Sequence, residues 1–188
     1  MPIPPMLTSP ATLPPFVGTD PTIAGTRSPY VASIEEVVQR FNTTPARKDI
    51  LTGLIAYRRE VRRLKFNAEF QWIAGSFVEN PGREPRDVDI VTFYDLRPAE
   101  IAAIQADAPR WNDLLTLANN PQSKASYLCD AYVVNMNGSG RTLVDQCHYW
   151  YGLFSHQRGS FAWKGLIVLD ARSPDDDVAA EHLLTMVP

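Results

Sequence analysis

Two aspartates near the middle of the chain have a spacing that suits metal chemistry. Asp87 and Asp89 flank Val88 and are followed by two more apolar residues. Side chains two residues apart in a strand project from the same face, so we expect the two carboxylates to point together. Like charges on one half-buried face repel each other, and a bound cation removes that repulsion. The pair therefore predicts a site for Mg²⁺ or Mn²⁺ completed by substrate phosphates.

A glycine and a serine form the second half of this candidate site. Gly75 and Ser76 directly follow the apolar run 70–74, and ten residues separate Ser76 from Asp87. Because glycine has no Cβ, its backbone can approach a phosphate closely, while Ser76 offers a hydroxyl and an amide. We therefore expect phosphate donors and metal ligands to converge at the ends of successive strands.

The two motifs together resemble the signature of the nucleotidyltransferases related to DNA polymerase beta. That signature is an apolar residue, Gly, then Gly or Ser, a spacer, and Asp-apolar-Asp-apolar, which residues 74–76 and 87–90 match. The order of Arg47, 75–78, 87–91 and 164–165 is also similar to an uncharacterised bacterial family of small nucleotidyltransferase-like proteins.

This resemblance implies an activity and a third acidic residue. It implies transfer of a nucleoside monophosphate from a nucleoside triphosphate (NTP) such as ATP to a hydroxyl of RNA, protein or a small molecule. Asp87 and Asp89 would hold the metal, and Asp130, at the start of the apolar segment 130–134, would complete the metal site and position the attacking hydroxyl. Asp145 and Asp170 are the fallback choices, and the alternative for Asp130 is a turn or strand-edge residue.

The segment after Ser76 departs from the resembled superfamily. Its active small members follow Gly-Ser with a helical turn that carries a basic residue, whereas residues 77–81 of this chain read Phe-Val-Glu-Asn-Pro. We expect Arg83, Arg86 or Lys164 to supply the positive charge for the phosphates instead. The alternative is that both arginines are solvated loop residues and that Lys164 only leads into a strand.

Composition and charge exclude several classes of protein. The chain has 188 residues, of which 45% are hydrophobic and 21% charged, as in a soluble globular domain. No apolar run approaches the ~20 residues that a membrane span needs. No Lys or Arg precedes Arg27, so a secretory signal is not expected either. We therefore expect a cytoplasmic protein. The net charge of −3 gives no overall field that favours nucleic acid.

Hydrophobic periodicity predicts helices alternating with short strands. Eight of the 16 prolines lie in residues 1–30, which we expect to form an extended arm ahead of a domain at 31–188. The predicted strands are 70–74, 88–93, 130–134 and 166–169. Predicted helices begin after Ser33, Thr44, Arg97, Pro109 and Ser173, and a further helix covers 143–154. The pattern is typical of an α+β (α/β) fold with a small mixed sheet of about four strands.

A second hypothesis is a binding role without strong catalysis. In that case the nucleotidyltransferase fold serves as an antitoxin or phage-defence subunit that binds a partner protein from the same operon. The proline-rich arm is one candidate contact. The other is the basic flank formed by Arg58, Arg59, Arg62, Arg63 and Lys65, which could instead contact RNA or be a solvated helix face.

Overall fold

A mixed five-stranded sheet forms the centre of the computed structural model, which describes residues 3–80 and 84–186. The strands are β1 (Tyr30–Ala32), β2 (Ala68–Ala74), β3 (Val88–Tyr94), β4 (Cys129–Asn135) and β5 (Ile167–Asp170). Their order across the sheet is β1-β5-β2-β3-β4. β2 is antiparallel to both of its neighbours, whereas β1 pairs with β5 and β3 pairs with β4 in parallel.

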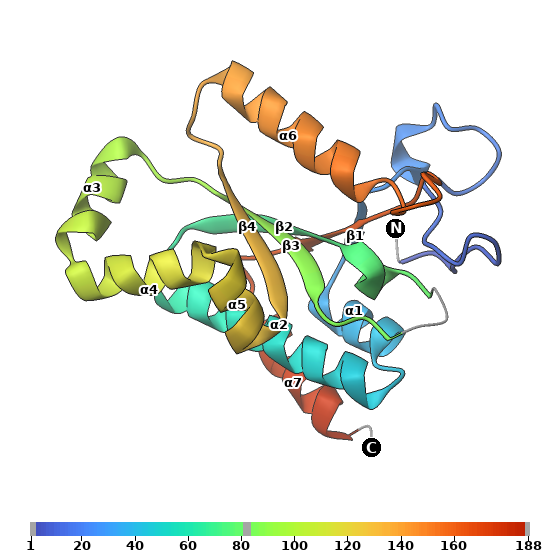
Figure 1. Cartoon of the computed structure of the whole chain (residues 1–188), viewed down its shortest axis with the longest axis horizontal. Coiled ribbons are helices and arrows are strands. Elements are labelled where there is room, and N and C mark those ends of the chain that lie inside the picture. Colours follow the sequence, from blue (N-terminus) through green and yellow to red (C-terminus); the bar gives the residue numbers. More distant parts are fainter. Residues whose placement is uncertain (1–2, 81–83, 187–188) are drawn as a thin grey trace.

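Seven α-helices are found among the described residues, and they cover the two faces of the sheet unequally (Figure 1). Six of them are α1 (Ile34–Phe41), α2 (Pro45–Arg63), α3 (Pro98–Ala106), α4 (Ala108–Ala118), α5 (Asn120–Tyr127) and α7 (Pro174–Met186). The seventh, α6 (Gly140–Phe154), lies alone across the opposite face from α2 and α5. Short 3₁₀ turns occupy Ala24–Thr26 and Gly75–Val78.

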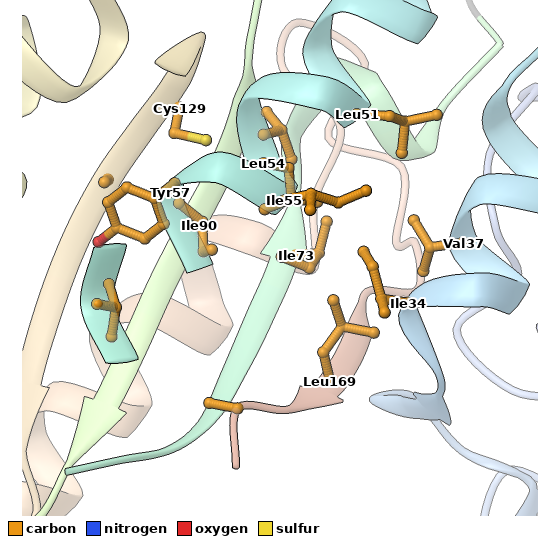
Figure 2. Packing of buried hydrophobic residues seen from close by; sticks show 14 of the residues in the cluster. Ile34, Val37, Leu51, Leu54, Ile55, Tyr57, Ile73, Ile90, Cys129 and Leu169 are labelled. Carbon is orange, nitrogen blue, oxygen red and sulfur yellow. The ribbon is translucent and has the colours of Figure 1, made fainter. Parts of the chain in front are cut away.

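Alternation along the strands divides the core into two clusters. Val88 and Ile90 of β3 belong to the larger cluster, which contains the buried side chains of α1 and α2 (Figure 2). Val91 and Phe93 belong to the smaller cluster beneath Trp150 and Phe154 of α6. Odd-numbered side chains of β3 therefore face α6, and this alternation puts residues 87 and 89 on the α6 side.

The predicted class, α+β with a small mixed sheet, is confirmed, although the sheet has five strands instead of four. The additional strand, β1, has only three residues and directly follows the proline-rich segment, where no periodicity can be read. The helix start predicted after Ser33 is also confirmed, and a capping box forms there: Ser33 Oγ accepts from the Glu36 amide, and the Glu36 side chain accepts from the Ser33 amide.

The predicted N-terminal arm packs against the domain in its described part. Leu13 is 0% exposed, and its carbonyl accepts a hydrogen bond from the Gly165 amide at 2.8 Å. The Tyr30 hydroxyl donates to the Pro14 carbonyl at 2.7 Å. Thr12 forms an isolated bridge with Glu79, close to the candidate site. The segment is thus integrated into the core around Leu13.

The arginine-rich flank of α2 is paired with acidic residues, one of them on α2 itself and the others on other helices. Arg58 is buried, and its Nε donates to Asp177 Oδ1 of α7 at 2.8 Å; Arg62 binds the same carboxylate. The exposed pairs are Arg59 with Glu181, and Arg63 with Glu60 and Asp113. A solvated helix face was therefore the wrong expectation for Arg58. The local pattern could not reveal its partner, because Asp177 lies far away in the sequence.

None of the helices in the part of the chain that the structure describes is both long enough and apolar enough to cross a membrane.

Candidate functional site

A cavity of about 460 Å³ opens where the ends of β2, β3 and β4 meet the carboxyl end of α6. Acidic and basic side chains dominate its wall. Its lining includes every predicted site residue that the structure describes, namely Gly75, Ser76, Arg86, Asp87, Asp89, Asp130 and Lys164. Arg83, the remaining predicted residue, lies outside the described residues. The fallback aspartates are elsewhere: Asp145 pairs with Arg141 on α6, and Asp170 pairs with Arg172.

The strand pairing brings the three aspartates together. β3 and β4 are parallel neighbours, and their register sets Asp89 directly opposite Asp130. Asp87 precedes Asp89 by two residues and lines the same cavity, as its spacing predicts. The side chains of Asp87 and Asp130 are 15% and 16% exposed, so both carboxylates are largely withdrawn from water while still reaching the cavity.

The turn after β2 holds the Asp89 carboxylate close to the backbone. β2 and β3 are antiparallel with Ala74 opposite Asp89, so the next residue, Gly75, lies beside that carboxylate. Gly75 has φ +77°, in the left-handed region, and a Cβ built on it would overlap Asp89 Oδ2. Glycine is therefore required here for two separate reasons, the backbone angle and the close approach.

Arg47 fixes the segment that follows this turn. It is buried on α2, and its Nη1 and Nη2 each donate at 2.7 Å, the first to the Phe77 carbonyl and the second to the Glu79 carbonyl. Two guanidinium nitrogens thus bind backbone carbonyls on either side of Val78. Arg47 therefore ties the described part of this departure from the superfamily pattern, residues 77–80, to α2.

Negative charge accumulates around Asp89. Burial raises its pKa from the ordinary 3.8 to about 6, and the carboxylates of Asp130 and Asp87 contribute to the same shift. Arg158 and Lys164 oppose the shift only in part. Three carboxylates in this confined space therefore favour either a proton or a bound cation.

Lys124 is a residue of this site that the sequence analysis missed. Its Nζ lies 2.6 Å from Asp87 Oδ2 and 3.7 Å from Asp130 Oδ2. Asn120, one turn earlier on α5, donates to Asp130 Oδ1. Hydrophobic periodicity gives no signal for α5, because Ser123 is its only fully buried residue, and so no sequence pattern places Lys124 here.

Lys164 reaches the Gly75 turn, where it was expected, but it is already paired. Its side chain is 3% exposed, and Nζ donates to the Gly75 carbonyl at 3.2 Å and binds the Glu79 carboxylate. Glu79 also accepts from Gln157 Nε2 at 3.0 Å. Glu79 was not predicted as a site residue, and its place in the cavity wall depends on the Arg47 contact.

The carboxylates of the site are oxygen donors of the kind that a hard divalent cation prefers, and two of them contact a lysine. Among the described residues, no group of three or more His, Cys, Asp and Glu side chains is arranged so that it could hold a metal ion. The Lys124 ammonium is the cation that contacts two of the three aspartates. Carboxylate oxygens are the ligands that Mg²⁺ and Mn²⁺ prefer, so this set fits such an ion by its chemistry.

Comparison with known proteins identifies the family of the chain. A family model described as a family of unknown function (DUF6932) matches residues 5–170, and the chain belongs to that family. Neither a curated protein nor a solved structure matches it. The family description assigns no activity, and a function for the chain must therefore come from the chemistry of its site.

Proposed function

We propose that this member of the DUF6932 family is a metal-dependent nucleotidyltransferase that moves a nucleoside monophosphate from an NTP to a hydroxyl of RNA, protein or a small molecule. The observation that carries the proposal is the grouping of Asp87, Asp89 and Asp130 beside the Gly75 turn in one cavity. The cavity volume of about 460 Å³ is in the usual range for ligand sites, about 300–1,000 Å³. The resemblance of residues 74–76 and 87–90 to the superfamily signature supports the same reaction.

Asp87, Asp89 and Asp130 are the residues that would hold Mg²⁺ or Mn²⁺. Their oxygens line one wall of the cavity, and the raised pKa of Asp89 reflects a charge that a cation would balance. When bound, the metal would neutralise charge on the triphosphate and on the leaving pyrophosphate.

The remaining side chains of the cavity suit a phosphate chain and an acceptor hydroxyl. Ser76 and the Gly75 turn bind phosphate oxygens, and Arg158 and Arg86 contribute positive charge from the cavity wall. Asp130 orients the acceptor and takes its proton. The acceptor oxygen then bonds to the α-phosphorus as the bond between that phosphorus and the oxygen bridging to the β-phosphate breaks, and pyrophosphate leaves.

Label transfer tests this proposal directly. Purified wild-type protein is incubated with α-³²P-labelled NTPs, Mg²⁺ or Mn²⁺, and host RNA and protein as acceptors. We expect labelled acceptor from the wild type, and a rate lower by at least about 100-fold for Asp87→Asn and Asp89→Asn. Asp145→Asn is the matched control, because this exposed α6 residue does not line the cavity. Equal labelling by all four proteins would refute the proposal.

Internal neutralisation of the site favours a second candidate function, a catalytically weak binding subunit of a toxin–antitoxin or defence complex. Lys124 and Lys164, two of its cations, are both bound by carboxylates of the chain itself. This function predicts a stoichiometric partner that co-purifies from the native host and is retained by the Asp87→Asn variant. It also predicts no label transfer by the complex, which would distinguish it from the enzyme.

A further inference from the structure

α5 presents two polar side chains to the acidic cluster from a fixed position. Asn120 and Lys124 lie one helical turn apart, and both reach Asp130. The helix is held tightly against α2, since a Cβ on Gly53 would overlap the Tyr127 carbonyl and the rings of Tyr57 and Tyr127 meet edge to face. The backbone of α5 therefore has little freedom, and any movement at this end of the site belongs to the side chains.

The Lys124 head group is the movable part. Its side chain is 45% exposed, in contrast to the 15% of Asp87, so solvent reaches the ammonium from the cavity. An ion pair with one partly exposed member contributes at most about 1 kcal/mol, which leaves it open to replacement by a stronger cation. The four-carbon stem lets the ammonium swing within the same cavity once it is displaced.

We propose that Lys124 is an exchangeable counterion that competes with the divalent cation for Asp87 and Asp130 and then binds the triphosphate. This inference rests on the proposed function, because it assumes that those aspartates hold the metal. An ammonium and a divalent cation cannot both occupy the same carboxylate oxygens. Lys124 therefore moves to phosphate oxygens only when metal and nucleotide are both present, and this exchange couples the two binding events.

Metal affinity tests the first half of the exchange without any turnover. Mn²⁺ binding to the full chain, without nucleotide, is measured by electron paramagnetic resonance for wild type, Lys124→Met, Lys124→Arg and Lys65→Met. Lys65 is an exposed lysine that does not line the cavity, so its variant is the matched control. We expect Lys124→Met to bind Mn²⁺ about fivefold more tightly than wild type, and the other two variants to bind like wild type.

Inorganic tripolyphosphate tests the second half, because it carries the phosphate chain without a base. In saturating Mg²⁺, isothermal titration calorimetry should show about tenfold weaker binding by Lys124→Met and unchanged binding by Lys65→Met. Unchanged tripolyphosphate affinity in Lys124→Met would overturn the transfer to phosphate. Equal Mn²⁺ affinity in all four proteins would overturn the competition alone, whereas Mn²⁺ binding by none of them would overturn both this inference and the proposed function.

Discussion

Asp89 is the carboxylate of the site whose ionisation is opposed by its surroundings. It is half-buried near two further carboxylates, those of Asp87 and Asp130, and its pKa is raised to about 6. Between pH 3.8 and about 6 the folded chain binds more of this proton than the unfolded chain does. The stability that the protonated carboxyl contributes is therefore complete below pH 3.8 and is lost as the pH rises through about 6.

Asp89→Asn should stabilise the metal-free protein at neutral pH, because it removes this buried charge. We expect the free energy of unfolding at pH 7.5 to rise by about 1–3 kcal/mol, and the gain to shrink to nearly zero at pH 4. Urea denaturation in the presence of a chelator, at both pH values, measures the difference. Asp145→Asn, on the exposed face of α6, is expected to change the stability by less than about 0.5 kcal/mol at either pH. A gain of equal size at both pH values would contradict the electrostatic explanation.

The site residues differ in how far sequence alone could reveal them. Asp87 and Asp89 follow from a two-residue strand spacing, and Gly75 from the end of an apolar run, so local pattern was sufficient. Asp130 was placed by resemblance, and the parallel register of β3 and β4 now sets it opposite Asp89. Lys124 enters the site only through tertiary packing of α5, which leaves no local signal.

At the scale of the element, strong periodicity and capping predicted most helices well. α1 and α2 begin at the cap residues Ser33 and Thr44, whose side chains accept from backbone amides as expected. β1 and α5 were missed because three residues cannot show a period and because α5 buries almost nothing apolar. Asp177, in the first turn of the helix predicted after Ser173, forms a buried ion pair with Arg58 that no local pattern indicates.

That ion pair fastens α7 to α2. The Asp177→Asn substitution leaves the buried Arg58 without its countercharge, so we expect a loss of about 3–5 kcal/mol in the free energy of unfolding. Urea denaturation measures it, with Glu181→Gln as the matched control between the same two helices. Glu181 pairs with Arg59 on the surface and should matter by less than about 1 kcal/mol.

A double variant separates lost charge from lost packing at this interface. Arg58→Met with Asp177→Leu removes both charges, so it should recover a part of the stability that Asp177→Asn loses. If Asp177→Asn proved no more costly than Glu181→Gln, the buried pair would not be what fastens α7.

At the scale of the whole molecule, the cavity depends on segments that are far apart in the sequence. The proline-rich segment bonds the chain next to a residue of the cavity wall, since the Leu13 carbonyl accepts from Gly165, the residue after Lys164. Thr12, next to Leu13, bridges Glu79, which in turn binds Lys164. Composition indicated only an extended arm, because neither proline content nor local pattern reveals that Leu13 is buried and hydrogen-bonded to a residue as distant in the sequence as Gly165.

Leu13→Ala should therefore destabilise the whole domain and not only its first residues. Leu13 is fully buried, and removing its side chain leaves a cavity in the hydrophobic core, so we expect a loss of about 2–4 kcal/mol in one cooperative unfolding transition. Leu7→Ala is the matched control, since Leu7 is exposed and should cost less than about 1 kcal/mol. Thermal unfolding followed by circular dichroism compares the two variants. Equal midpoints would mean that residues 3–30 pack on the surface without supporting the core, whereas a lower midpoint for Leu13→Ala would make this segment part of the domain that holds the site.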